Sequence, residues 1–93
     1  MGTKPRTKPK RLAEKLLRIR VALGLSQPEL VKRLGVEGEI TFKQISKYET
    51  GLREPTLTIL LQYARLAGVS MESLADDKID LPEKLPSKPK HKT

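Results

Sequence analysis

The spacing of the hydrophobic residues predicts an all-α protein. Between residues 12 and 23, apolar side chains recur at intervals of three and four positions, the spacing of one face of a helix. These residues are Leu12, Leu16, Ile19 and Leu23. Leu17 and Val21 widen the stripe, which predicts a helix packed on two sides, and Gly24 supplies a stop signal. No segment alternates apolar and polar residues for long enough to predict a strand.

A short second helix is predicted over residues 27–34. Ser26 is placed to cap its N-terminus, and Glu29, three positions later, completes a capping box. Leu25 and Leu30 form the matching hydrophobic staple. The glycine that follows Leu34 ends the helix.

A third helix, over residues 42–49, carries the most informative polar face. Thr41 is its predicted N-cap, with Gln44 as the capping-box partner. Ile45 and Tyr48, three positions apart, share the inward face. The side chains left on the outer side are Phe42, Lys43, Gln44 and Lys47. A short helix that presents amide and ammonium groups is suited to a DNA major groove.

Two further helices complete the pattern. Thr56 caps a helix that ends at Gly68, and Ser70 caps a short one over residues 71–75. The apolar face of the longer helix contains Leu57, Leu60, Leu61 and Ala64. We therefore predict five helices packed as a compact bundle.

Three segments, taken together, resemble one known family. They are GLSQPEL at residues 24–30, ISKYETGLREP at residues 45–55 and GVSMESL at residues 68–74. Their combination resembles the Xre/Cro/phage-repressor, lambda-repressor-like helix-turn-helix family over roughly residues 12–75. The resemblance implies a five-helix domain that binds double-stranded DNA as a homodimer and regulates transcription, typically as a repressor. One departure is an apparent insertion of residues 37–40, which lengthens the turn before the third helix and adds two acids.

The resemblance also implies which residues contact DNA. The base-reading positions of the family match Phe42, Lys43 and Lys47; Gln44 is a weaker candidate because its capping role competes. The phosphate-binding positions match Gln27, Thr50 and Arg53. Arg53 has the alternative of pairing with Glu54. Arg20 and Glu49 match a buried structural ion pair of the family.

The net charge of +8 changes this interpretation little, because the excess lies in the tails. Residues 12–77 contain nine basic and nine acidic side chains, so the predicted domain, residues 10–77, is close to neutral. Residues 1–9 are predicted to be a disordered basic arm, and residues 78–93 a disordered tail rich in proline and lysine. Such tails either contact DNA or are merely solvated. Leu81 and Leu85 could dock on the domain or on a partner, although we favour an undocked tail.

Other classes of function have little support. The chain has no cysteine, no apolar run of bilayer length and no signal peptide, so we expect a cytoplasmic, nucleoid-associated protein. His91 lies in the lysine-rich tail, and Asp76 and Asp77 are interpreted as solvated charge. We therefore expect no catalytic site, metal or cofactor. Two alternatives remain open: an antitoxin that neutralises a toxin, or a helix-turn-helix fold used only to bind another protein.

Overall fold

Residues 9–86 are described by the computed structural model, and they form five α-helices and no strand. The helices are α1 (Leu12–Leu23), α2 (Gln27–Leu34), α3 (Phe42–Thr50), α4 (Leu57–Ala67) and α5 (Met71–Ala75). The all-α prediction is confirmed, and the predicted helices start and end within one residue of these bounds. The tail residues 1–8 and 87–93 lie outside the described part of the chain.

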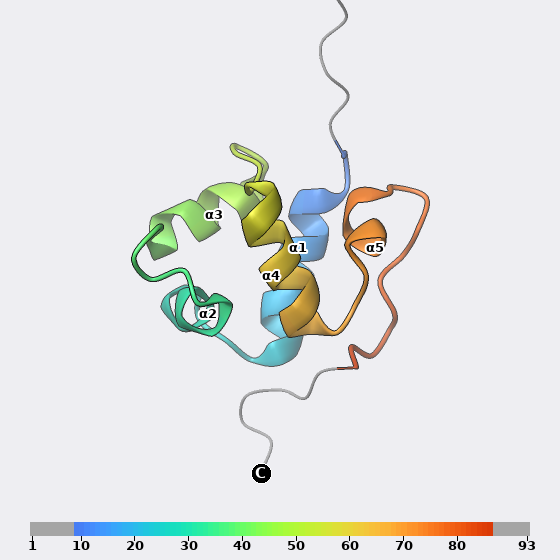
Figure 1. Cartoon of the computed structure of the whole chain (residues 1–93). Helices are drawn as coiled ribbons and strands as arrows, with labels where there is room; N and C mark the ends of the chain where they lie inside the picture. The colour runs from blue at the N-terminus through green and yellow to red at the C-terminus, as the bar shows by residue number, and fades with distance from the viewer. Residues whose placement is uncertain (1–8, 87–93) are drawn as a thin grey trace, which may run out of the picture.

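The helices pack around α1 and α4, which lie at the centre of the molecule (Figure 1). The pair α2 and α3 lies on one side of this centre, and α5 lies on the other (Figure 1). Helix α1 contacts α3, α4 and α5, while α2 contacts α3 and α4. Among the largest side chains with essentially no exposure are Leu16, Ile19, Leu30, Ile45, Tyr63 and Leu74, so every helix contributes to one core.

The helix ends follow from local chemistry. At α2, the Glu29 N–H donates to Ser26 Oγ at 3.2 Å and the Ser26 N–H donates to Glu29 Oε1 at 2.9 Å, the predicted capping box. At α3, Thr41 is the N-cap as predicted, but its hydroxyl accepts from the Lys43 N–H at 3.3 Å. The Gln44 N–H instead donates to the Thr41 carbonyl at 3.0 Å. The predicted capping box with Gln44 is therefore wrong, because the tight first turn has already used that N–H.

Three apolar side chains assigned to packed faces are exposed. Leu17 is 38% exposed, Val21 is 64% exposed and Leu57 is 74% exposed. The stripe Leu12, Leu16, Ile19 and Leu23 is buried as predicted. However, Lys15, and neither Leu17 nor Val21, is the additional residue of α1 that is buried in the domain, since Lys15 is only 2% exposed.

The residues after α5 lie along α1 and form a segment that we name the C-terminal strap (residues 76–86). The ammonium group of Lys15 donates to the carbonyl oxygens of Ser73, Asp76 and Ile79 at 2.8, 2.9 and 2.7 Å. An ammonium group has three N–H donors, so this buried lysine has an acceptor for each of them. Further along α1, the Arg18 guanidinium donates to the carbonyls of Leu81, Pro82 and Glu83.

The strap also contributes to the core. Leu81 is 5% exposed, and Leu85 packs against the core from a partly buried position. Residues 79–85 therefore dock on the domain through these contacts, whereas we favoured an undocked tail. The basic side chains of α1 hold main-chain carbonyls of the strap, a type of contact that hydrophobic periodicity does not reveal.

Candidate nucleic-acid interface

The outward face of α3 is the centre of the candidate interface. Ile45 and Tyr48 are buried at 0% and 4% exposure, which fixes the rotation of α3 about its axis. The opposite side of the helix is therefore turned to solvent. Phe42 is 46% exposed, Lys43 is exposed, and Gln44 and Lys47 are half-buried. The structure thus brings together on one surface the four side chains predicted to read bases.

The Gln44 side chain and the charge of Arg53 both affect the pKa of the Tyr48 hydroxyl in α3. Burial raises the pKa of the Tyr48 hydroxyl, while a hydrogen bond from the Gln44 side chain and the positive charge of Arg53 lower it by less. The amide of Gln44 thus has a partner within α3. This interaction, and not the capping role that the structure contradicts, is the reason to rank Gln44 below its neighbours as a base-reading residue.

The predicted pair of Arg20 and Glu49 is present and joins α1 to α3. Arg20 Nε donates to Glu49 Oε2 at 2.7 Å, and Arg20 Nη2 donates to Glu49 Oε1 at 3.0 Å. The Glu49 side chain is 5% exposed and the Arg20 side chain 18%. The hydrogen bond to Glu49 raises the pKa of the Arg20 guanidinium against the opposing effect of burial. A two-point contact of this kind restrains the orientation of both side chains.

Gln27 is the third member of this network, and its contact with Glu49 was not predicted from the sequence. Its amide nitrogen donates to Glu49 Oε1 at 3.1 Å, so the first residue of α2 is tied to the last turn of α3. The two residues are 22 positions apart, and the glutamine of the SQ motif was assigned to phosphate alone. An amide group has two N–H donors, so one donor remains available for the predicted phosphate contact.

Thr50 and Arg53 lie where α3 leads into its loop. The Thr50 hydroxyl donates to the carbonyls of Ser46 and Lys47 at 3.1 and 3.3 Å, so its proton points back along the helix. Arg53 is exposed. Of these two predicted phosphate-binding residues, Arg53 therefore has the side chain that can more readily reach a phosphate.

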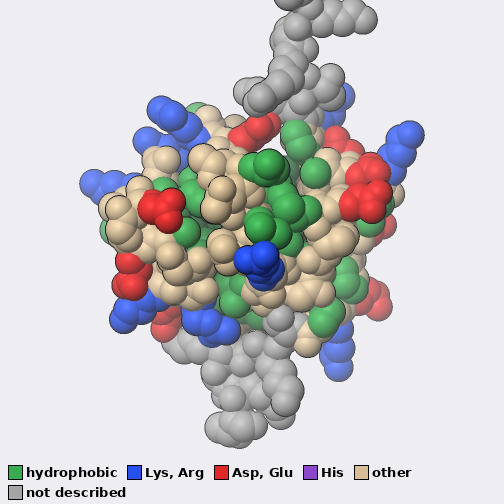
Figure 2. Space-filling model, in the orientation of Figure 1, with side chains coloured by type: hydrophobic (Ala, Val, Ile, Leu, Met, Phe, Trp, Pro, Cys, Tyr) green, Lys and Arg blue, Asp and Glu red, His purple; other side chains and the backbone are tan. Residues whose placement is uncertain are grey.

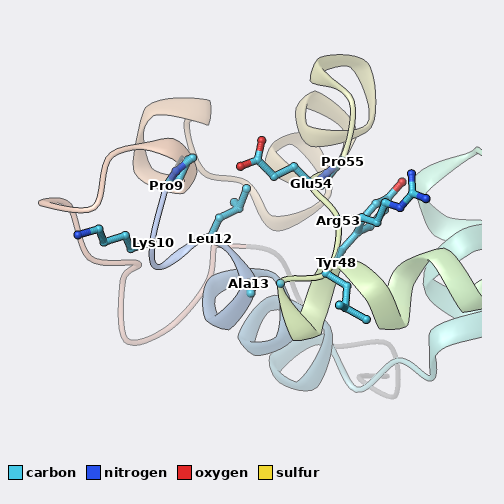
Figure 3. A pocket seen from close by; sticks show the side chains of 10 residues that line it. Pro9, Lys10, Leu12, Ala13, Tyr48, Arg53, Glu54 and Pro55 are labelled. Atoms are coloured by element: carbon cyan, nitrogen blue, oxygen red, sulfur yellow. The ribbon is translucent and has the colours of Figure 1, made fainter. Parts of the chain in front are cut away.

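A hollow separates this loop from the start of α1 (Figure 3). It is lined by Pro9, Lys10, Leu12, Ala13, Tyr48, Gly51, Leu52, Arg53, Glu54 and Pro55. The two elements approach closely at Gly51, where an added Cβ would lie 3.9 Å from Ala13 Cβ. Gly51 has φ of 81°, a conformation that favours glycine. Lys10 and Arg53 lie on opposite rims and point away from one another (Figure 3).

Residues 37–40, the apparent insertion, form a closed turn beside the start of α3. The N–H groups of Glu39 and Ile40 both donate to the Val36 carbonyl, at 2.9 and 3.1 Å, and Val36 is buried. Glu37 and Glu39 are exposed. Because the turn closes on Val36, Thr41 keeps its place as the N-cap of α3. The turn over residues 37–40 therefore leaves the start of the helix intact.

Asp77 corrects one interpretation of the acidic residues. Its carboxylate accepts the N–H groups of Lys10 and Arg11, each at 2.9 Å, and these bonds lower the pKa of Asp77. Interpreting Asp77 as solvated charge was wrong, because α5 ends beside the start of α1.

Within residues 9–86, no group of three or more His, Cys, Asp or Glu side chains is arranged to hold a metal ion, and no helix is long and apolar enough to cross a membrane. His91 lies outside the described residues.

Comparison with known proteins gives one match. A family model described as Helix-turn-helix matches residues 11–74, which is most of the chain and extends from the residue before α1 into α5. Searches of curated proteins and of solved structures give no match.

Proposed function

The chain belongs to the Cro/C1-type helix-turn-helix family, and from this premise we propose that it is a sequence-specific DNA-binding transcriptional regulator. The observation that carries the proposal is the exposed polar face of α3, whose orientation is restrained by contacts with two other helices. Ile45 and Tyr48 anchor α3 in the core, and Glu49 binds both Arg20 of α1 and Gln27 of α2. A rigidly held helix of this kind is suited to enter a major groove.

In the proposed complex, the side chains near the start of α3 read the bases. Lys43 and Lys47 carry ammonium groups that can pair with guanine O6 and N7. The half-exposed ring of Phe42 can pack on a thymine methyl group. Gln44 is the secondary candidate, for adenine.

Three further residues are proposed to bind phosphates on either side of these base contacts. Gln27 lies at the first position of α2, where the helix dipole favours an anion, and it has one free amide donor. Thr50 and Arg53 lie at the opposite end of α3. Phosphate contacts on both sides of a helix would set its register in the groove without carrying sequence information.

We propose that the functional unit is a homodimer that acts as a repressor on an inverted repeat. A single α3 reads only a few base pairs, so two copies related by a two-fold axis would supply the length of a specific site. Their half-sites should lie about one helical turn apart, roughly 34 Å from centre to centre. Binding at a promoter would place the protein in the cytoplasm at the nucleoid.

Selection of bound sequences from a random pool of duplexes tests this function. We expect enrichment of an inverted repeat, and a Lys43→Ala, Lys47→Ala double variant should lose the enrichment while its melting temperature stays unchanged. A Lys32→Ala, Arg33→Ala double variant on α2 is the matched control, because both residues are exposed and it removes the same number of positive charges. Failure of the native protein to enrich any sequence would contradict the proposal.

A protein-binding module, such as an antitoxin, is the second candidate function. Exposed apolar residues favour it: Leu52 is 76% exposed and Leu57 is 74% exposed. Figure 2 shows hydrophobic side chains gathered over α4, the helix that begins with Leu57. Purification from the native host at low salt distinguishes the two functions. A small protein that copurifies in fixed proportion and depends on Leu52 and Leu57 would favour the module, particularly if no DNA is bound.

A further inference from the structure

The first turn of α2 leaves few N–H groups for an anion. The Ser26 N–H donates to Glu29 Oε1 and the Glu29 N–H donates to Ser26 Oγ, so the capping box uses both groups. Pro28, the second residue of the helix, carries no N–H. The main-chain N–H and the side-chain amide of Gln27 are therefore the donors by which this helix start can bind a phosphate.

Glu49 holds the side-chain amide of Gln27. Gln27 Nε2 donates to Glu49 Oε1 at 3.1 Å. The Glu49 side chain is almost fully buried, so its carboxylate is a fixed acceptor inside the domain, whereas Gln27 is half-buried. An amide nitrogen carries two N–H groups in one plane. Because one of them is bound to a buried carboxylate, the amide is restrained and its other N–H is directed away from Glu49.

Arg20 fixes the helices that carry these two residues. Its Nη1 donates to the carbonyl of Leu25 at 3.0 Å, two residues before Gln27. Its Nε and Nη2 donate to the two carboxylate oxygens of Glu49 at 2.7 and 3.0 Å. One guanidinium therefore holds both the segment that enters α2 and the last turn of α3. The position of the Gln27 amide consequently follows the position of α3.

The ion pair also balances the charge of the acid beside the proposed phosphate contact. An unpaired carboxylate at this place would repel DNA. The two-point contact with Arg20 places a positive charge directly against Glu49. Glu49 therefore supplies a hydrogen-bond acceptor for Gln27 without a net negative charge that faces the DNA.

We propose that Glu49 is a positioning residue for DNA binding, which orients the Gln27 amide so that its second N–H donates to a DNA phosphate. This role rests on the proposed function, in which Gln27 binds the DNA backbone. Glu49 itself does not contact the DNA. Since Glu49 belongs to α3, one network sets both the phosphate contact of α2 and the position of the base-reading helix. An acidic residue thus has a net favourable effect on DNA binding.

A double-mutant cycle with four proteins of equal net charge tests this role. Gln27→Ala removes the amide, and the paired change Arg20→Met with Glu49→Met removes the ion pair while it deletes one positive and one negative charge. Replacing both members of a buried ion pair with apolar residues avoids an unpaired charge. The fourth protein carries all three substitutions. Affinity for the duplex enriched from the random pool is measured at one salt concentration, at a temperature at which melting curves show that the proteins are folded.

We expect Gln27→Ala to lower the affinity of the native protein by about tenfold or more, the effect of losing a hydrogen bond to a charged group. In the Arg20→Met, Glu49→Met background, the same substitution should lower affinity by less than about threefold, because the amide is no longer oriented. Gln62→Ala on α4 is the matched control, since it removes the same group outside the candidate interface. It should leave affinity unchanged in both backgrounds.

Hydrogen exchange of the Gln27 side-chain amide is a second measurement, which needs no change in the ion pair. The resonances are identified by their absence from the spectrum of Gln27→Ala. Without DNA, the Nε2 proton bound to Glu49 should exchange slowly with water and the other proton fast. Addition of DNA should slow the second proton while the first stays protected. Loss of protection at the first proton would show that the amide leaves Glu49 to bind DNA, which would overturn the proposed role.

The cycle gives three further outcomes against the role. Equal losses from Gln27→Ala in the two backgrounds would show that Gln27 binds phosphate without help from Glu49. Unchanged affinity of Gln27→Ala in the native background would show that its side chain does not bind DNA, while the proposed function would stand. Absence of DNA binding by the native protein would overturn both. If the Arg20→Met, Glu49→Met protein does not fold, hydrogen exchange in the native protein decides.

Discussion

Single side chains set the chemistry of the candidate interface. The α3 residues that point away from the core are those whose replacement should alter DNA recognition, whereas those that point inward, such as Ile45, hold the helix in place. Exposed positions can be tested without loss of the fold, because substitutions away from the core usually change stability by less than about 0.5 kcal/mol.

Replacing Lys43 or Lys47 with alanine should weaken binding to the preferred DNA site more than binding to random DNA. A bidentate contact with a base contributes about 1–3 kcal/mol of discrimination. Titration of each variant against both duplexes measures the difference. An equal loss on the two duplexes would instead assign that lysine to a phosphate.

Replacing Tyr63 with phenylalanine should leave stability unchanged or raise it. Among the described residues, the Tyr63 hydroxyl is a buried polar atom without a hydrogen-bond partner, and burial raises its pKa strongly. A buried hydroxyl without a partner costs about 1–3 kcal/mol, so its removal should offset any loss of packing. Urea denaturation measures the change, and destabilisation by more than about 1 kcal/mol would show that the hydroxyl has a stabilising contact.

At the level of the helices, polar contacts between the end of one helix and a side chain of another hold the short helices in place. Glu49 of α3 binds Arg20 of α1 and Gln27 of α2, and Lys15 of α1 binds the end of α5. Helices of eight, nine and five residues are too short to be stable alone. Their mutual contacts therefore decide whether the candidate interface is preorganised.

Arg20→Ala should destabilise the fold by more than Gln27→Ala. Loss of Arg20 leaves the buried carboxylate of Glu49 without its ion partner, which costs roughly 3–5 kcal/mol for a well-buried pair. Loss of Gln27 removes one hydrogen bond to a charged group, a contribution of about 1.5–3 kcal/mol. Denaturant unfolding of both variants provides the comparison, and the reverse order would show that Gln27 is the main partner of Glu49.

The acidic turn before α3 should weaken DNA binding at long range. Glu37 and Glu39 are exposed beside the helix start, so Glu37→Gln with Glu39→Gln should tighten binding to all duplexes without sharpening sequence choice. The gain should shrink with salt, because the Debye length falls from about 10 Å at 0.1 M to about 3 Å at 1 M. Titration at two salt concentrations measures it. Weaker binding by the double variant would mean that the acids organise the turn.

At the scale of the whole molecule, the two ends of the domain meet. The start of α1 and the C-terminal strap are joined by Asp77, Arg11 and Lys15, so contacts between the first and last described segments enclose the core. These contacts are ionic and polar, and they include the charged carboxylate of Asp77. The stability of the domain should therefore depend on pH.

Acid should remove the contribution of Asp77 to stability. The N–H groups of Lys10 and Arg11 lower the pKa of Asp77 from its ordinary value of 3.8, with smaller effects from the charges of Lys15 and Arg11. A group whose pKa is lowered by folding stabilises the protein above its unfolded pKa, and that contribution is lost as pH falls through the folded value. Between pH 7 and pH 2, the melting temperature of Asp77→Asn should therefore fall less than that of Asp76→Asn. Equal falls would contradict the role of the carboxylate.

The five helices and most of their ends could be predicted from local sequence patterns. Capping side chains such as Ser26 and stop glycines such as Gly35 act on backbone groups within a few residues, so their effect can be predicted locally. The amphipathic stripe of α1 and the inward residues of α3 follow from helical periodicity for the same reason. The pairing of Arg20 with Glu49 was predicted from the resemblance to the family, because helical periodicity alone does not indicate it.

The contacts by which the ends of these helices satisfy one another's polar groups could not be predicted from the sequence. Asp77 lies 66 positions from Arg11, and Lys15 lies 64 positions from Ile79, so neither contact has a local pattern. Lys15 and Arg18 bind main-chain carbonyls, which every residue carries, and no side-chain pattern marks the partner. The exposure of Leu17 and the burial of Lys15 follow from these distant contacts, because the face of α1 that is covered depends on where the strap lies.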